Sequence, residues 1–294
     1  MGKTIGKSSL ALFAMTVAAY MAIPAAQASY DQYPDLSASS LRYAVKTKRK
    51  LDLHYSVYAG GFEALHATLV MNLDKRAYGL KVKAETQGLI GDLFPWQASY
   101  ITTGHTQHGM LVPSVYTARN TWRKNEKITE MDYGPNGRIL KSTTQDGDKT
   151  TVKRDFKATL TRHTLDMLTG VLAMLQSVKN TDSCAGAFPV FDGKRRFNIV
   201  LKNDGEEMLK SSSYSDYRGM ALRCTLTVQP VAGFSKEDQK RGWLAVQHHT
   251  EAHHMLPTLW LGRLKGTGQV VPVKMEIASE FGAVVAHLSN SNAD

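Results

Sequence analysis

Short runs of alternating apolar and polar residues, separated by turn signals, recur along most of this 294-residue chain. In residues 51–57, Leu51, Leu53, Tyr55 and Val57 alternate with polar side chains. Successive side chains of a strand point to opposite faces of a sheet, so a period of two predicts a strand with one buried face. A chain that repeats this pattern is constrained to an antiparallel β fold.

The pattern extends through both halves of the chain. It predicts further strands in the first half at residues 65–73, 78–84, 96–102, 115–122, 127–133 and 138–144. In the second half it predicts strands at residues 197–201, 207–214, 221–229, 243–248, 258–264, 270–277 and 282–288. Turn signals at short intervals, such as 134–137 and 146–147, favour a sheet that curls on itself. We therefore expect a mostly β fold, in which a curved antiparallel sheet forms a half-barrel or a spiral β-roll.

One segment has the period of a helix instead. In residues 164–178 the leucines recur at intervals of three and four, at Leu165, Leu168, Leu172 and Leu175. This spacing predicts one amphipathic helix, capped by Thr164 and covering the apolar concave side of the sheet. No Pro-, Gly- or Ser-rich linker divides the remainder, so after a polar linker at 29–40 we expect one domain over 41–294.

The first 28 residues have the pattern of a secretory signal peptide. Lys3 and Lys7 precede an apolar run at 10–23, and small residues follow at 26–28. We predict cleavage between Ala28 and Ser29, which places the product in the periplasm. The alternative is an uncleaved membrane anchor, which is disfavoured because the run is shorter than the roughly 20 residues that cross a bilayer. The residue directly after the cleavage site is not a cysteine, so the mature N-terminus has no site for lipid attachment. A soluble product is therefore expected.

The chain is basic, with a formal net charge of +10 that falls to +8 without Lys3 and Lys7. A positive field favours anionic partners, such as lipid headgroups, lipopolysaccharide or acidic wall polymers, and it permits peripheral membrane contact. Nucleic acid is not an expected partner in this compartment. Basic clusters occur at 46–50 and 194–196, and the alternative interpretation of each is a solvated strand face or edge.

The two cysteines, Cys184 and Cys224, predict a disulfide in an oxidising compartment. A zinc site would need more ligands, and a thioredoxin-like redox centre would need a CxxC motif. Whether such a bond is structural or switched stays open.

Several motifs resemble those of the exported bacterial domain-of-unknown-function family 3108 (DUF3108). They are Cys-Ala-Gly-Ala-Phe-Pro-Val-Phe-Asp-Gly at 184–193, Tyr-Arg-Gly at 217–219, Pro-Val-Ala-Gly-Phe at 230–234 and Tyr-Ser-Val-Tyr-Ala-Gly-Gly at 55–61. The resemblance covers residues 51–288. It implies an exported, β-rich protein of unassigned biochemistry, similar in layout to periplasmic half-barrel or β-roll proteins that support the envelope or carry lipids.

Arg195 and Arg196 leave the start of a predicted strand on opposite faces. One of them is a candidate contact for an anionic headgroup. The alternative is that an inward-facing arginine pairs with a carboxylate of the chain, such as Asp192 or Asp216.

No recognised catalytic motif is present. The chain lacks His-Glu-x-x-His, Gly-x-Ser-x-Gly and a phosphate-binding Gly-rich loop. Gly-Thr-Gly at 266–268 lacks the third glycine of a dinucleotide-binding motif and indicates a hairpin turn. We therefore expect no enzymatic activity and no cofactor.

One cluster of histidines stands out, at His248, His249, His253 and His254. If the segment were helical, His249 and His253 would lie one turn apart and could chelate a metal, with the other two histidines or Glu251 as further ligands. Its position between two strand-like runs favours a solvent-exposed loop instead.

Three functions remain open. The first is a non-catalytic periplasmic protein that supports the envelope and binds a lipid, a glycolipid, an acidic envelope polymer or an envelope protein in its curved sheet. The second is a structural or protein-interaction scaffold, and an interior filled by its own side chains would favour it. The third is a metal-dependent enzyme, which requires the imidazoles to converge beside a pocket.

Overall fold

A computed structural model describes residues 49–240, 242–279 and 282–293 of the chain. The predicted signal peptide, the cleavage point between Ala28 and Ser29, and the linker at 29–40 lie outside these residues.

The described residues form one antiparallel sheet of fourteen strands, which does not close on itself. Across the sheet the strands follow the order β8-β7-β6-β5-β4-β3-β2-β1-β14-β13-β12-β11-β10-β9. The bounds are β1 Arg49–Ala59, β2 Phe62–Leu73, β3 Ala77–Thr86, β4 Trp96–Gln107, β5 Met110–Trp122, β6 Asn125–Tyr133, β7 Ile139–Asp146, β8 Lys149–Lys153, β9 Gly186–Phe191, β10 Arg196–Leu209, β11 Gly219–Ala232, β12 Thr258–Arg263, β13 Val270–Ser279 and β14 Gly282–Ala293. The predicted fold class, a mostly β protein with a curved antiparallel sheet, is confirmed.

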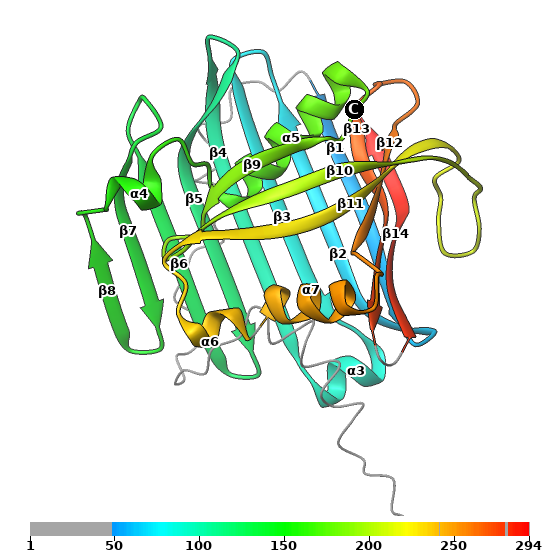
Figure 1. The fold of residues 1–294 in the computed structure, drawn as a ribbon, viewed down its shortest axis with the longest axis horizontal. Coiled ribbons are helices and arrows are strands. Elements are labelled where there is room, and N and C mark those ends of the chain that lie inside the picture. The colour runs from blue at the N-terminus through cyan, green and yellow to red at the C-terminus, as the bar shows by residue number, and fades with distance from the viewer. Residues whose placement is uncertain (1–48, 241, 280–281, 294) are drawn as a thin grey trace, which may run out of the picture.

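Two meanders make up this sheet. Strands β1 to β8 run outward in chain order, strands β14 to β9 run outward in reverse order, and the pairing of β1 with β14 joins them. Figure 1 shows β9, β10 and β11 crossing in front of the sheet formed by β2 to β6. The sheet therefore curls around an interior with two facing walls.

Helices connect or cover the strands at five places in the described residues. They are α3 Gly88–Leu93, α4 Ala158–Thr161, α5 Met167–Thr181, α6 Lys236–Gln239 and α7 Gly242–Ala252. Among the described residues, no helix combines the length and the hydropathy that crossing a membrane requires. The single predicted helix corresponds to α5, and the sequence analysis missed the other four.

Helix α5 lies inside the curl, in contact with β9 and β13 on one side and with β4 and β5 on the other (Figure 1). Its residues Leu172 and Leu175 have no exposed surface, and they pack into the main hydrophobic core together with strands of both meanders. The prediction that the helix covers the apolar concave side is confirmed.

The start of α5 differs from the prediction by three residues. Asp166 caps the helix, because its carboxylate accepts a hydrogen bond from the Thr169 backbone N–H at 2.9 Å. Thr164 does not cap it, and its hydroxyl donates instead to the carbonyl oxygen of Thr161. Leu165 pairs with Val190 of β9 as an isolated parallel bridge.

Two strand predictions were wrong or incomplete, and two strands were missed. Residues 243–248 belong to α7, whose buried side chains Leu244, Gln247 and Thr250 recur every three residues, as one helix face requires. The predicted strand at 207–214 is the end of β10 up to residue 209. Strands β8 and β9 were not predicted. All five residues of β8 are exposed, so the segment has no buried face to create an alternating pattern.

Candidate ligand-binding site

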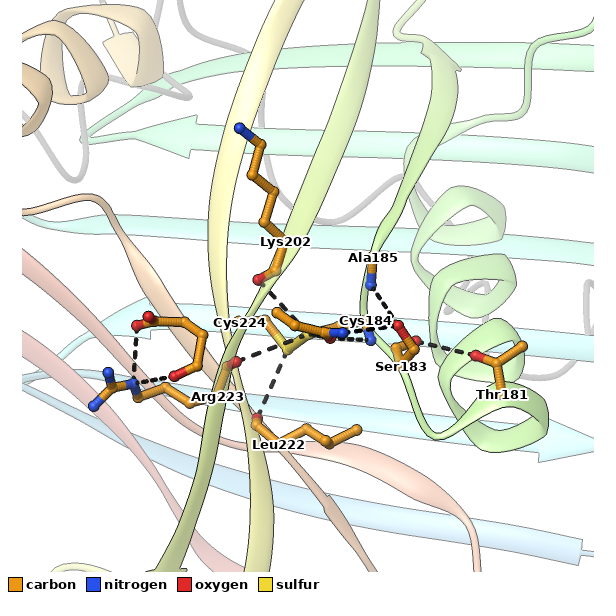
Figure 2. Close-up of a disulfide and its surroundings, with 10 residues drawn as sticks. Thr181, Ser183, Cys184, Ala185, Lys202, Leu222, Arg223 and Cys224 are labelled. Atoms are coloured by element: carbon orange, nitrogen blue, oxygen red, sulfur yellow. Dashed lines mark hydrogen bonds and ion pairs between the residues drawn. A yellow bond between two sulfur atoms is a disulfide. The ribbon is translucent and has the colours of Figure 1, made fainter.

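The predicted disulfide between Cys184 and Cys224 is present, with 6.2 Å between the two Cα atoms. It joins the segment after α5 to β11, as Figure 2 shows. Both residues are buried in the main core. Asn203 of β10 fixes the segment from the other side, because its side chain accepts from the Cys184 N–H at 2.8 Å and donates to the Ser183 hydroxyl at 3.0 Å. The bond thus ties the segment that follows α5 to β11.

Arg195 pairs with carboxylates of the chain itself, and its role as a ligand contact stays a prediction. Its Nε donates to Asp192 at 2.8 Å, and its Nη1 lies 3.5 Å from Asp238. The alternative interpretation, pairing with Asp192, is confirmed, whereas Asp216 is not involved. Arg196 donates from Nη1 to the carbonyl oxygen of Thr159 in α4 at 3.1 Å. Its role as a ligand contact stays a prediction.

The four candidate metal ligands do not converge. His248 and His249 lie in α7, so the expectation of a loop was wrong for this part of the segment. The rings of His249 and His253 are neighbours, with centroids 4.4 Å apart, but the Nδ1 of His253 lies 2.8 Å from the carbonyl oxygen of His249. The main chain turns at His254, which has a φ of 55°.

Glu251 accepts a hydrogen bond from Gln247 at 2.9 Å. Within the part of the chain that the structure describes, no three His, Cys, Asp or Glu side chains are placed to hold a metal. The predicted metal centre therefore lacks its third ligand.

A buried polar cluster that the sequence analysis missed lies at the start of α5. The Asp166 carboxylate accepts hydrogen bonds from the Thr169 hydroxyl at 2.6 Å and from the Thr102 hydroxyl of β4 at 3.1 Å. The Tyr78 hydroxyl of β3 lies 3.1 Å from the Thr169 hydroxyl. Burial raises the pKa of Asp166, although these hydrogen bonds act in the opposite direction.

This cluster has no surface through which a substrate could reach it, because Thr102, Asp166 and Thr169 have no exposed surface. Its hydrogen bonds connect α5 to the β3–β4 wall. The arrangement fixes the helix inside the curl and offers no reactive group to solvent. One sequence signal pointed to it, since Thr102 is a polar residue at an inner-face position of an alternating run.

The interior beyond α5 is less completely covered. At the end where α3 joins β3 to β4, the inner face carries a second apolar cluster of Leu65, Trp96 and Ala98. Side chains packed around it keep part of their surface exposed, namely Val57, Ala67, Ala84, Tyr100 and Trp122. We call these eight residues the inner-face cluster.

The facing wall carries a third cluster. Val190, Phe197 and Ile199 of β9 and β10 are buried there, against Val228 and Phe234 among others. Helix α7 is held on this wall, because the Gln247 side chain accepts from the Val228 backbone N–H at 2.6 Å. Each smaller cluster touches the main core, but the two do not merge with each other. Side chains of α5 thus fill part of the interior. Beyond α5, the two facing walls carry separate apolar clusters.

A family profile described as "Protein of unknown function (DUF3108)" matches residues 54–289. No curated protein matches the chain. Among solved structures, the chain is similar to a beta-barrel-like protein of domain of unknown function DUF1849 from Brucella abortus, with a TM-score of 0.47 and 10% sequence identity over 84% of this chain and 97% of that chain.

Proposed function

The chain belongs to the DUF3108 family of proteins of unknown function, and from this premise we propose that it is an exported, non-catalytic protein of the cell envelope that binds an amphiphilic ligand inside its curved sheet. The ligand class is a lipid or glycolipid, whose acyl chain lies along the inner-face cluster. The protein acts in the periplasm after removal of its signal peptide.

One observation carries the proposal. Apolar side chains of the inner-face cluster face the interior, yet Val57, Ala84 and Trp122 are only partly buried by the chain itself. Covering apolar surface is favourable by about 25 cal/mol per Å². An acyl chain would cover this surface, whereas a sugar or a peptide backbone alone would leave it exposed to water.

Two further features agree with an envelope location. A buried disulfide is typical of proteins that fold in an oxidising compartment. The formal charge of +8 that remains without Lys3 and Lys7 favours association with anionic envelope surfaces.

The test is native mass spectrometry, with lipid extraction, of untagged protein purified from its own periplasm. We expect a co-purified lipid or glycolipid at a defined stoichiometry. Protein that is uniformly empty, and that also fails to take up a lipid extract of the same envelope, would contradict ligand carriage.

The second candidate function is a structural or protein-interaction scaffold. It is favoured by helix α5, which fills a large part of the interior with its own side chains, including the fully buried Leu172 and Leu175. A scaffold predicts an empty protein in the experiment above and a protein partner after crosslinking in the periplasm.

A further inference from the structure

One end of the sheet is lined by lysines and arginines. Alternate turns of an antiparallel meander lie at the same end, so the β2–β3, β4–β5 and β6–β7 turns share an end with the close of β8. The pairing of β1 with β14 brings the β12–β13 turn to this end as well. Figure 1 shows it along the upper edge of the sheet, opposite α3. Its exposed basic side chains, which we call the basic rim, are Lys75, Arg76, Arg138, Lys153, Arg154 and Lys265.

The chain does not neutralise the basic rim. None of its side chains forms an ion pair with a carboxylate among the described residues, whereas Lys141, on the strand face nearby, lies 3.6 Å from Asp132. The turn segments that carry the rim contain two carboxylates, Asp74 and Asp155. Neighbouring cations without partners repel one another, so an anionic partner at this end is favourable.

An exposed apolar side chain lies among these cations. Met110 follows the β4–β5 turn and is 66% exposed. The turn is a tight two-residue hairpin turn, because His108 and Gly109 both have positive φ, of 50° and 76°. It therefore holds Met110 in place at the end of the sheet. Cations around an exposed apolar side chain are typical of surfaces that bind the headgroup layer of a membrane.

The basic rim is extended. Neighbouring strands are about 4.8 Å apart, so the turns from β2–β3 to the end of β8 span roughly 25 Å. A single small anion contacts one turn at a time, whereas a surface that carries many anionic groups contacts several turns together. A soluble acidic polymer supplies the charges but offers no apolar layer for Met110.

We propose that the basic rim docks the protein on the surface of a bilayer that contains anionic phospholipids, with Met110 entering the headgroup layer. The opposite end of the sheet is less suited to this contact, because its exposed cations Arg123 and Lys124 share it with the exposed carboxylates of Glu63 and Asp92. Docking through the rim directs the α3 end and the inner-face cluster away from the bilayer. The inference therefore goes beyond the proposed function and does not require a ligand inside the sheet.

The test measures the binding of untagged protein, purified from its own periplasm, to large unilamellar vesicles by cosedimentation. The vesicles consist of phosphatidylcholine alone or of equal parts of phosphatidylcholine and phosphatidylglycerol. At low ionic strength we expect at least about tenfold stronger binding to the anionic vesicles. High salt should remove most of this difference, since the Debye length falls from about 30 Å at 0.01 M to about 3 Å at 1 M.

Two charge-reversal variants locate the surface. Lys75→Glu combined with Arg76→Glu changes the β2–β3 turn of the basic rim, and Arg123→Glu combined with Lys124→Glu makes the same charge change on the β5–β6 turn at the opposite end. All four side chains are exposed, so neither variant disturbs the core. We expect the first variant to weaken binding to anionic vesicles at least about tenfold and the second less than about threefold.

A second pair of variants tests the apolar contact. We expect Met110→Ser to weaken binding to the anionic vesicles about threefold, because less apolar surface leaves water on docking. Met208→Ser is the matched control, since Met208 of β10 is 58% exposed and lies outside the rim. It should leave binding unchanged, and equal effects of the two substitutions would contradict insertion of Met110.

The remaining outcomes also decide the proposal. Equal losses in the two charge-reversal variants would assign binding to the net charge of the chain and overturn docking through the basic rim. Equal binding to both kinds of vesicle, or binding to polyglutamate but to neither vesicle, would overturn docking on an anionic bilayer. Protein that binds anionic vesicles but carries no lipid would support this inference and contradict the proposed function, and lipid-loaded protein that binds no vesicles would do the reverse.

Discussion

Gly104 of β4 lies directly across from Tyr78 of β3, so close that a Cβ atom added at Gly104 would lie 2.3 Å from the tyrosine ring. The same Cβ would lie 2.5 Å from the carbonyl oxygen of Val112 in β5. The aromatic ring therefore occupies the space that any other residue at position 104 would need. This packing presents the Tyr78 hydroxyl to Thr169 of α5.

We predict that Gly104→Ala destabilises the protein by about 1–3 kcal/mol, because the tyrosine or the backbone must move to relieve the overlap. The matched control is Gly79→Ala on β3, where the nearest atom to the added Cβ is 3.8 Å away. We expect less than about 1 kcal/mol of change in the control. Urea denaturation followed by circular dichroism measures both, and similar midpoints for the two variants would refute the packing argument.

Asp166 should make stability depend on pH in a defined direction. Burial raises its pKa in the folded state, so the folded state binds the proton more tightly than the unfolded state, whose value is about 3.9. The stabilisation from protonated Asp166 is fully present at pH values below the pKa of the unfolded state. It is lost as the pH rises through the raised pKa of the folded state. Asp166→Asn cannot titrate, so the wild type should lose stability relative to this variant across that window.

Urea denaturation at a series of pH values tests this expectation. Asp148→Asn, which changes an exposed carboxyl on the β7–β8 turn, is the matched control and should leave the pH profile unchanged. Parallel profiles for the wild type and Asp166→Asn would show that Asp166 does not carry the effect.

The disulfide should contribute substantially to stability. Replacing Cys184 and Cys224 together by serine removes a bond between residues 40 positions apart, and we predict a loss of about 2–4 kcal/mol. Thermal unfolding of the double variant measures the loss. The reduced wild type should unfold at a similar temperature, and a variant as stable as the oxidised protein would exclude a stabilising role for the bond.

Filling the inner face should displace an apolar ligand. Ala84→Phe adds a large side chain within the inner-face cluster, whereas Lys83→Phe adds the same side chain at the neighbouring exposed position. We expect Ala84→Phe to lower lipid co-purification at least severalfold and Lys83→Phe to leave it unchanged. The readout is the lipid stoichiometry by native mass spectrometry. Equal occupancy in both variants would place the ligand elsewhere.

Much of the fold could be predicted from the sequence because sheet alternation is a local signal. Residues 51–57 alternate, and they lie in strand β1. The signal failed where a short apolar run fits two periods, as at 243–248, which forms helix α7. It was absent at β8, which buries nothing. The pairing of β1 with β14 was not predictable, since alternation gives the face of a residue but not the neighbouring strand.

Less of the candidate site could be predicted. The disulfide followed from the cysteine count, because two cysteines allow one pairing. The histidines attracted attention by their density in the sequence, but only the rings of His249 and His253 are recorded as neighbours, and no group of three ligating side chains forms in the described residues. Trp96 was predicted only as the first residue of the strand at 96–102, and the lack of a partner for its buried N–H among the described residues is a property of three-dimensional packing. Asp166 was missed because nothing in its sequence neighbourhood indicates burial.

The pairing of β1 with β14 also governs how the chain must fold. In the register, Leu51 lies opposite Ala293, so the central contact of the sheet connects residues that are almost the whole described chain apart. Loops of this length close slowly, and high contact order is associated with slow folding. Until the last strand has been synthesised, one edge of β1 has no partner, and such edges are prone to intermolecular pairing. That edge of β1 therefore stays open to intermolecular pairing until β14 is available to cover it.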